Sequence, residues 1–331
     1  MSNQPTRILI AGGAGFLGAN LVRLCLRKPG THITVLDSFD PRLQSTAAHL
    51  EEVSARIRIV RGSLLDDRLV AELLEGQDII FNCAGQTSHT LSMRDPLFDA
   101  RTNCLGSLTL LETMRAVNRS AVVVYTSTSS VTGKALDVSI DEYHGEKPLD
   151  IYSANKGAAE KYYRIYHRAH GLKTVAIRFA NLYGPYGKGH SDFGFVNYFI
   201  HLARRGEEIR IFGDGSQIRN VMFVEDAAEV LWLAAGVPYL QGETFFAAHD
   251  EHFSVREIAE TIVRRFGRGS VVTVPWPDDR RGIEIDHVRI SSAAFRALTG
   301  WRPRYSFDEG LRKTRAVCEE TRALEPCEAF A

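Results

Sequence analysis

Cysteine is scarce in this chain of 331 residues, and its spacing does not fit a zinc site. No two cysteines form a C-x-x-C pair and no histidine cluster accompanies them, so we expect no metal centre. Their odd number and wide scatter are typical of free thiols in a reducing compartment. The five are Cys25, Cys83, Cys104, Cys318 and Cys327.

Net charge and long apolar runs are lacking as well. Lys and Arg together number 40, as do Asp and Glu, so the formal net charge is zero. This balance does not favour a polyanionic partner such as a nucleic acid. No uninterrupted apolar run approaches a membrane span, and residues 1–7 lack the apolar centre of a signal peptide. We therefore expect a cytoplasmic protein that binds neither nucleic acid nor a membrane.

What the chain does contain is a series of short apolar runs rich in β-branched residues. They lie at 7–12, 32–37, 57–62, 78–85, 121–127 and 173–179. Their apolarity is continuous rather than alternating, which indicates strands buried on both faces, and helical periodicity separates them. This alternation predicts an α/β fold with a doubly wound parallel sheet of the Rossmann type.

The pattern changes near residue 180, where glycine and proline become frequent and the later elements are shorter. We predict a dinucleotide-binding domain over 1–180 and a smaller α/β substrate lobe over 181–331. The two are expected to be interleaved, with the option that a segment near 209–236 returns to the first lobe.

A glycine-rich loop follows the first predicted strand in "RILIAGGAGFLGANL". Gly12 allows a tight turn, Gly15 allows a pyrophosphate to approach the backbone, and Gly18 lets the next helix pack close to the strand. Asp37 ends the second strand 19 residues after Gly18. A carboxylate there accepts hydrogen bonds from a ribose and repels the extra phosphate of NADP, so NAD is the expected cofactor. A glycine-rich turn without a ligand is the alternative.

Tyr152 and Lys156 lie four residues apart in "DIYSANKGAAEKYY", which places them on one face of a predicted helix. Thr128 lies at the end of the fifth predicted strand, where a doubly wound sheet binds its ligands. These three residues are candidates for proton transfer. The alternative for Tyr152 is an aromatic residue that only packs or forms a hydrogen bond.

Together with "GGAGFLG", "AGQ", "NCLGS", "RFANLYGP" and "GDGSQIRN", these motifs resemble the extended short-chain dehydrogenase/reductase superfamily. The resemblance covers about residues 6–315 and is closest to UDP-glucose 4-epimerase-like members of the nucleotide-sugar epimerase/dehydratase branch. It implies further cofactor contacts at Phe16, Leu17, Leu64, Ala84 and Asn103. A helix cap is a rival role for Asn103.

The resemblance also implies how the reactive residues work. A phenol has an ordinary pKa near ~10, and we expect Lys156 and the positive nicotinamide ring to lower the pKa of Tyr152. Tyr152 then takes a proton from a sugar hydroxyl, while Thr128 holds the same oxygen. Lys156 is expected to bind the ribose of the nicotinamide half.

Ser129 and Ser130 indicate which reaction is expected. In dehydratases of this family Asp and Glu occupy these two positions, and in decarboxylases a Glu takes the second. Serine at both resembles the 4-epimerases, which invert C4 through a transient ketone and keep their NAD tightly bound. A nucleotide-sugar reductase, dehydrogenase, dehydratase or other epimerase is the alternative, and a non-catalytic dinucleotide sensor is a third.

The resemblance further implies residues that bind a nucleotide-diphosphate sugar. They are Ser129, Asn181, Arg219 and Arg281, and Arg280 could take the place of Arg281.

Several positions depart from the family pattern. Thr132 replaces a usual Tyr, Ser63 a usual Asp near the adenine, and Asn220 the usual Asp after Arg219. We interpret His89 as a polar loop residue near the sugar pocket. A homodimer is expected through helices near 95–117 and 153–170, as in the family.

Overall fold

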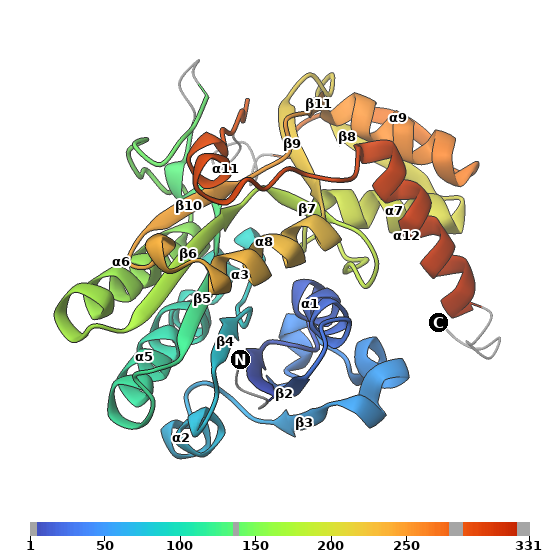
Figure 1. The fold of residues 1–331 in the computed structure, drawn as a ribbon. Helices are drawn as coiled ribbons and strands as arrows, with labels where there is room; N and C mark the ends of the chain where they lie inside the picture. The colour runs from blue at the N-terminus through green and yellow to red at the C-terminus, as the bar shows by residue number, and fades with distance from the viewer. Residues whose placement is uncertain (1–4, 135–138, 278–286, 323–331) are drawn as a thin grey trace.

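The computed structural model describes residues 5–134, 139–277 and 287–322. Seven parallel strands form the main sheet in the order β10-β6-β5-β4-β1-β2-β3 (Figure 1). The strands are β1 (Thr6–Ala11), β2 (Thr31–Asp37), β3 (Arg58–Arg61), β4 (Ile79–Asn82), β5 (Val122–Thr128), β6 (Lys173–Phe179) and β10 (Thr244–Ala247). The predicted doubly wound α/β fold is confirmed. Its strand order reverses between β1 and β4, which is where such sheets bind ligands.

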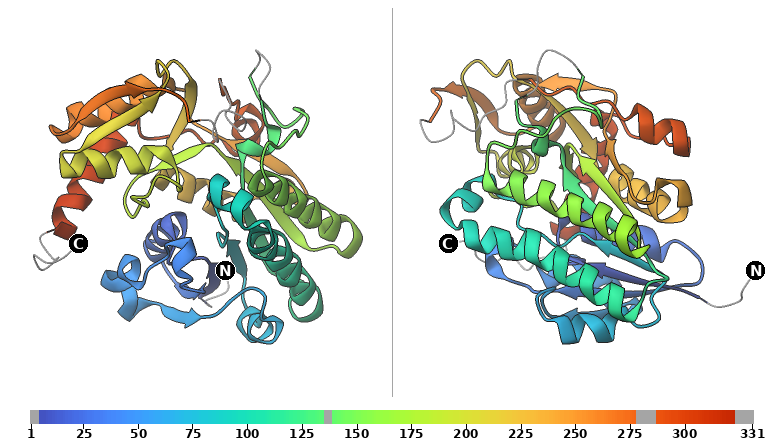
Figure 2. Two further views of the ribbon diagram at one scale, coloured as in Figure 1. Left: turned by 180° about the vertical axis from the view of Figure 1, so that it is seen from behind. Right: turned by 90° about the vertical axis from the view of Figure 1, so that its left-hand side faces the viewer.

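Helices cover both faces of the main sheet (Figures 1 and 2). On one face α1 (Phe16–Leu26) packs beside α8 (Val224–Gly236). The other face carries α2 (Asp67–Leu74), α5 (Gly106–Val117) and α6 (Ile151–His170). Burial on both faces explains why inner strands such as β1 and β4 are apolar along most of their length rather than at alternate positions, whereas the edge strand β3 is largely exposed.

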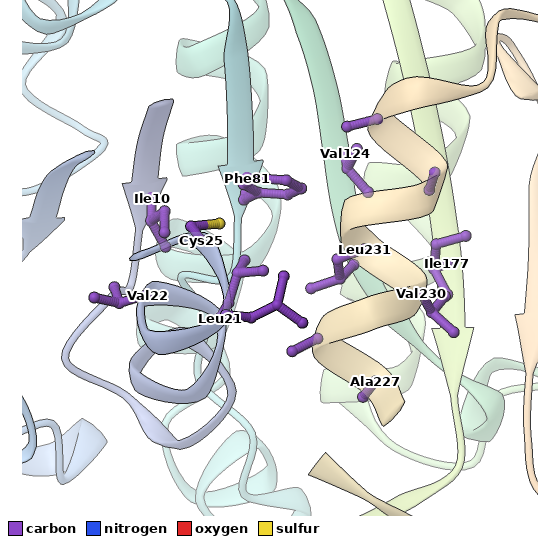
Figure 3. Close-up of a cluster of buried hydrophobic side chains, with 14 of the residues drawn as sticks. Ile10, Leu21, Val22, Cys25, Phe81, Val124, Ile177, Ala227, Val230 and Leu231 are labelled. Carbon is purple, nitrogen blue, oxygen red and sulfur yellow. The ribbon is translucent and has the colours of Figure 1, made fainter. Parts of the chain in front are cut away.

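The core beneath α1 and α8 joins parts of the chain that are far apart in sequence (Figure 3). Leu21 on α1 and Leu231 on α8 are fully buried between the helices and the sheet. Burial of each such side chain contributes about 1.5–3 kcal/mol. This packing fixes α1 against the sheet, and with it the glycine loop that precedes α1.

The second half of the chain adds two small sheets above the main one. One has the order β11-β9-β7 and the other pairs β12 with β8. Their strands are β7 (Asn181–Tyr183), β8 (Glu208–Phe212), β9 (Ile218–Phe223), β11 (His252–Ser254) and β12 (Ser270–Val274). Helices α7 (Phe195–Arg205), α9 (Val255–Phe266) and α12 (Phe307–Arg322) pack with them around a core of their own.

Within the interleaved region, β8 and β9 lie in the small sheets, whereas α8 and β10 pack on or extend the main sheet. The domain boundary near residue 180 stays a prediction.

The other helical elements of the described residues each span ten residues or fewer. The α-helices are α3 (His89–Arg94), α4 (Pro96–Asp99) and α11 (Ala293–Thr299). A π-helical turn, η3 (Ala100–Leu105), leads into α5. The 3-10 turns are η1 (Pro41–Leu43), η2 (Ala47–Arg56), η4 (Ser129–Thr132) and η5 (Pro238–Leu240).

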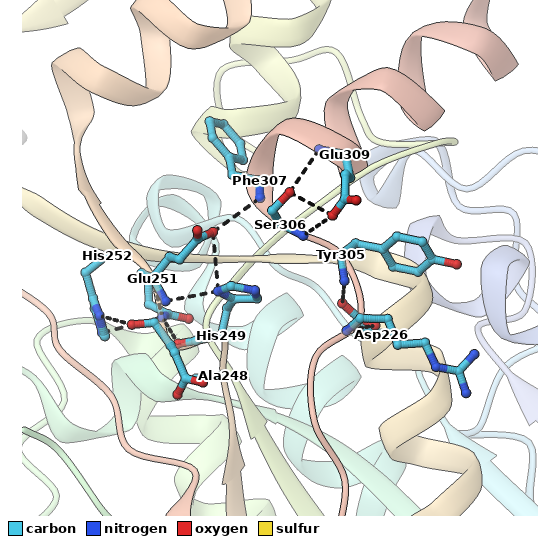
Figure 4. A network of polar contacts seen from close by, with 12 residues as sticks. Asp226, Ala248, His249, Glu251, His252, Tyr305, Ser306, Phe307 and Glu309 are labelled. Carbon is cyan, nitrogen blue, oxygen red and sulfur yellow. Dashed lines mark hydrogen bonds and ion pairs between the residues drawn. The ribbon is translucent and has the colours of Figure 1, made fainter.

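A polar network attaches the segment before α12 to the rest of the fold (Figure 4). Asp226 on α8 accepts hydrogen bonds from the backbone N–H groups of Arg304 (3.0 Å) and Tyr305 (3.3 Å). Glu251 accepts one from the backbone N–H of Phe307 (3.4 Å). Burial raises the pKa of Asp226 to about 6. The two backbone hydrogen bonds hold this segment in place and offset part of the free-energy cost of burying the Asp226 carboxylate.

Candidate active site

A large cavity lies at the carboxyl ends of the main-sheet strands, between them and the small sheets. Its volume is about 760 Å³, within the usual range of ligand pockets of about 300–1,000 Å³. The glycine loop, the ends of β2, β4 and β5, the start of α6, and β7 to β9 all contribute to its wall. Most of the predicted cofactor and substrate residues thus line one continuous cavity, the exceptions being Asn103, which does not line it, and Arg281, which lies outside the described residues.

The glycine loop has the close contacts that its sequence predicted. Gly12 has a φ of +76°, and a Cβ there would lie 2.6 Å from the backbone N of Ala84. A Cβ on Gly18 would lie 2.1 Å from the carbonyl oxygen of Gly12. Gly15 is the N-cap of α1 and provides no side-chain cap, so the first N–H groups of α1 are available to an anion.

Asp37 is buried and lies at the end of β2, on the cavity wall. Its Oδ2 accepts a hydrogen bond from the N–H of Ala14 (3.0 Å). Its Oδ1 accepts from the N–H of Phe39 (3.0 Å) and the hydroxyl of Ser45 (2.8 Å). These donors hold the carboxylate in one orientation, and lone pairs remain on its oxygens for a ribose hydroxyl.

The other predicted cofactor residues divide into two groups. Phe16, Leu17, Leu64 and Ala84 line the cavity. Asn103 does not: it is buried in η3, and its side-chain N–H₂ donates to the carbonyl oxygen of Gln86 (2.9 Å). Its Oδ1 has no hydrogen-bond partner within the described ranges. A cofactor role for Asn103 stays a prediction.

Taken together, the cavity fits NAD. The Gly12 and Gly18 contacts leave room only for hydrogen at these Cα atoms, so the bare backbone forms the wall of the cavity. The uncapped start of α1 suits a pyrophosphate and Asp37 suits an adenosine ribose.

Thr128, Tyr152 and Lys156 lie together on the wall of the same cavity. Thr128 ends β5, and the other two lie in the first two turns of α6, where Asp150 is the N-cap. Tyr152 is 7% exposed and Lys156 is 3% exposed. The ammonium group of Lys156 donates to the carbonyl oxygen of Thr126 (2.8 Å), which fixes its position beside the strand.

The pKa of Tyr152 differs from the sequence-based expectation. Burial raises this pKa above its ordinary value, and a hydrogen bond with Thr128 lowers it in part. The negative charges of Asp150 and Asp99 raise it further. In the protein alone desolvation therefore outweighs the lowering effects, and the lowering expected from Lys156 together with a bound nicotinamide ring stays a prediction. Burial also lowers the pKa of Lys156 to about 8.

A chain of hydroxyl groups leads away from Tyr152. The Thr128 and Ser130 hydroxyls are 2.9 Å apart, and the Ser130 backbone N–H also donates to Thr128 (3.2 Å). The Ser153 hydroxyl donates to Ser130 (2.8 Å). The Ser130 backbone N–H donates to the Thr128 oxygen, which leaves the Thr128 hydroxyl proton available for the hydrogen bond to Tyr152.

The predicted substrate residues Ser129, Asn181 and Arg219 line the other half of the cavity. The amide of Asn181 donates to the carbonyl oxygen of Asn220 (3.0 Å), and one guanidinium nitrogen of Arg219 donates to the carbonyl oxygen of Ile218 (2.9 Å). Arg281 lies outside the described residues, as does Arg280.

The positions that depart from the family pattern find local partners. Thr132 is buried and its hydroxyl closes the η4 turn on the carbonyl oxygen of Ser129 (2.9 Å). Ser63 lies on the cavity wall and accepts from the N–H of Leu65 (3.2 Å). Asn220 is buried and donates to the carbonyl oxygen of His249 (2.6 Å).

Two residues of the cavity wall were not predicted as functional. His89, expected to be a polar loop residue near the sugar pocket, is the first residue of α3, and its Nδ1 lies 2.6 Å from a carboxylate oxygen of Asp150. Its place in the segment that follows β4 was a signal, because the connections at that end of a parallel sheet face the ligand. Lys188 also lines the cavity, and burial lowers its pKa to about 8. Its position in a loop beyond β7 gave no signal.

Within the described part of the chain, no helix is long and apolar enough to cross a membrane. The same residues contain no group of three or more His, Cys, Asp or Glu side chains suited to a metal ion.

Comparisons with known proteins agree with this geometry. Residues 8–245 match the model of the NAD-dependent epimerase/dehydratase family. The UDP-glucose 4-epimerase of Mycolicibacterium smegmatis is 31% identical over 309 residues, or 93% of this chain and 97% of that protein. The solved UDP-glucose 4-epimerase of Thermotoga maritima with UDP-glucose has a TM-score of 0.86 at 26% identity, covering 96% of this chain and 100% of that one.

Dehydratases are similar as well. The dTDP-glucose 4,6-dehydratase DesIV of Streptomyces venezuelae, solved with NAD bound, has a TM-score of 0.85 at 29% identity, with coverage of 96% and 98%. The likeness therefore extends to both reaction types, and what they have in common is the extended short-chain dehydrogenase/reductase fold and its NAD dependence. On its sequence, its fold and the residues of its cavity, the chain belongs to the NAD-dependent epimerase/dehydratase family.

Proposed function

We propose that this protein is an NAD-dependent epimerase of a nucleotide-diphosphate sugar and that it inverts C4. The observation that carries the proposal is the meeting of Thr128, Tyr152 and Lys156 in one cavity, with serine at both 129 and 130. No carboxylate follows Thr128 at the positions where a dehydratase carries its Asp and Glu, because residues 129 and 130 are both serine.

When bound, NAD accepts a hydride from the sugar carbon and can return it. The protein supplies the matching proton transfer. Tyr152 takes the proton of the sugar hydroxyl as the carbon is oxidised and gives it back when the carbon is reduced. The hydroxyl of Thr128, held by Ser130, positions the oxygen on which this proton moves.

Tyr152 can take a proton from the sugar hydroxyl near neutral pH only if its raised pKa falls. The hydrogen bond with Thr128 already offsets part of the rise, so the remaining fall has to come from positive charge beside the phenol. The positive charge of Lys156, one helical turn away, favours the phenolate further.

The substrate half of the cavity suits a diphosphate. Arg219 presents a planar cation, which matches phosphate oxygens in pairs. Asn181 provides a neutral donor and acceptor for a sugar or phosphate oxygen. The 4-epimerases among the relatives, one of them solved with UDP-glucose, support this substrate class.

The proposal is tested by incubating the purified protein, without added NAD, with a panel of nucleotide sugars and following the products by NMR. We expect inversion of a single stereocentre at C4 with no net oxidation or reduction. Loss of water or of carbon dioxide would refute the proposal, and so would stoichiometric consumption of added cofactor.

We also propose that the protein is a homodimer, paired through α5, α6 and the turn before α5. Large apolar side chains are exposed on these elements, among them Leu105 (47%), Val117 (42%) and Ile165 (54%). Figure 1 shows α5 and α6 side by side at one edge of the molecule. Sedimentation analysis is expected to show a dimer that Leu105→Glu and Ile165→Glu together convert to a monomer. A monomeric parent protein would contradict this.

A further inference from the structure

His89 and Asp150 form a hydrogen-bonded pair beside the proposed reactive tyrosine. Their atoms Nδ1 and Oδ2 are 2.6 Å apart. The Asp150 side chain is 5% exposed and does not line the cavity, whereas the imidazole is 45% exposed and does. The carboxylate thus lies behind the ring, and the ring faces the space that receives the substrate.

The hydrogen bond sets the tautomer of the imidazole. Burial raises the pKa of Asp150, but its hydrogen bonds with His89 and Ser153 outweigh this, and the net shift is downward. Asp150 is therefore ionised and accepts, so Nδ1 of His89 carries the proton. In the neutral ring the other nitrogen, Nε2, then has a free lone pair.

The ring is held firmly in place. It meets the Tyr152 ring edge-on, with 4.9 Å between centroids and an interplanar angle of 79°. The segment before it is anchored by the buried Gln86, whose amide donates to Asp99 (2.6 Å) and to the carbonyl oxygen of Ser88 (2.7 Å). The basic Nε2 of His89 is thus held next to the phenol of Tyr152, which in the proposed reaction takes the proton of the sugar hydroxyl.

We propose that His89, oriented by Asp150, is a second proton acceptor of the active site and acts on the carbon next to the transient ketone. This rests on the proposed function, because NAD must first oxidise the neighbouring carbon. Nε2 takes the proton of that C–H bond, whose electron pair forms the C=C bond of an enolate. The negative charge moves to the former ketone oxygen, which the Tyr152 hydroxyl binds, and the new imidazolium lies against Asp150.

In the reverse step the imidazolium returns a proton to the carbon. The site therefore exchanges a ring hydrogen with solvent in addition to inverting C4. This activity is absent from the simple hydride cycle, in which the hydrogen at C4 leaves and returns without meeting water.

The charges around His89 favour this role. Asp150 at the start of α6 stabilises the imidazolium directly, and Asp99 on α4 adds a second negative charge near Tyr152 and Lys156. Lys156 on α6 is the opposing positive charge, and its ammonium donates to the carbonyl oxygen of Thr126. Asp150 is hydrogen-bonded to the imidazole, so its negative charge acts on the ring at contact distance.

The test measures deuterium incorporation in D₂O, by NMR and mass spectrometry, in two arms. The first arm supplies the nucleotide sugar that the protein epimerises. The second supplies a nucleotide 4-keto-6-deoxy sugar, so that exchange no longer depends on oxidation by the protein, and compares it with buffer alone. The variants are His89→Gln and Asp150→Asn, since asparagine keeps the helix cap but removes the charge. His170→Gln, at the exposed far end of α6, is the matched control.

In the second arm we expect deuterium at C3 or C5 at a rate at least about tenfold above buffer. His89→Gln should lower this rate at least tenfold and Asp150→Asn by a smaller factor, and His170→Gln should leave it unchanged. Exchange no faster than in buffer, or full exchange with His89→Gln, would overturn the inference. Exchange in the second arm without turnover in the first would uphold the inference and refute the proposed function instead.

Discussion

The buried carboxylate of Asp226 makes a quantitative prediction about stability and pH. Its pKa is raised to about 6 from an ordinary 3.8, a difference of about 2.2 units. At about 1.36 kcal/mol per unit, the full linkage is about 3 kcal/mol. The folded protein binds the proton more tightly than the unfolded chain does. This contribution to stability is therefore present at low pH and lost as the pH rises through about 6.

Asp226→Asn should remove this part of the pH dependence. Two-state linkage predicts that the titration of Asp226 lowers the free energy of unfolding of the parent by about 2 kcal/mol between pH 4.5 and pH 7.5. The variant lacks this loss, so its free energy of unfolding relative to the parent should rise by about 2 kcal/mol over the same interval. Asparagine offers one acceptor to the two N–H groups of Arg304 and Tyr305, which costs stability at every pH. That cost is the same at both pH values. It therefore cancels when the variant–parent difference in the free energy of unfolding at pH 4.5 is subtracted from the difference at pH 7.5.

The assay is urea unfolding of both proteins at the two pH values, followed by tryptophan fluorescence. The reasoning is refuted if the difference between variant and parent is the same at both pH values within about 0.5 kcal/mol, the usual effect of a neutral surface change.

Two further predictions concern the glycine loop and a buried ion pair. Gly18→Ala should weaken NAD binding at least tenfold, measured by calorimetry, because the added Cβ has no room. Gly236→Ala, whose added Cβ would meet nothing within 4 Å, should bind NAD as the parent does. Equal NAD affinities of the two variants would contradict this prediction. Glu160→Gln should lower the free energy of unfolding by about 3 kcal/mol, since it leaves the guanidinium of Arg178 buried without its main partner. Lys161→Gln, which removes an exposed pair, should cost under about 1 kcal/mol, and a similar loss in both variants would argue against the burial effect.

The fold could be predicted from the sequence because its signals are local. A strand buried on both faces is apolar along most of its length, and the six runs found this way correspond to β1 to β6, of which the edge strand β3 is largely exposed. The seventh strand, β10, was not expected in the main sheet. It has four residues, and its pairing with β6 depends on tertiary packing that no short pattern reveals.

The candidate site was predictable where spacing carries the chemistry and not where distant segments meet. The glycine loop, Asp37 and the Tyr152–Lys156 pair each follow from positions close in sequence. The pairing of His89 with Asp150 joins residues 61 positions apart, so only the fold brings them together.

The direction of a pKa shift could not be predicted from residue types either. A lysine one turn away was expected to lower the pKa of Tyr152, but burial of the ring has the larger effect. The extent of that burial depends on how the helices close over the sheet.

The most direct test of the account is the rate of C4 inversion in Tyr152→Phe, measured by NMR with the nucleotide sugar that the parent protein converts. Removing a general acid–base group typically costs about 10²–10⁴-fold, so we predict a loss of at least a hundredfold with substrate affinity retained. Tyr162→Phe, on the same helix, is the matched control and should convert the sugar at the parent rate. Full turnover by Tyr152→Phe would contradict the claim that this phenol carries the proton.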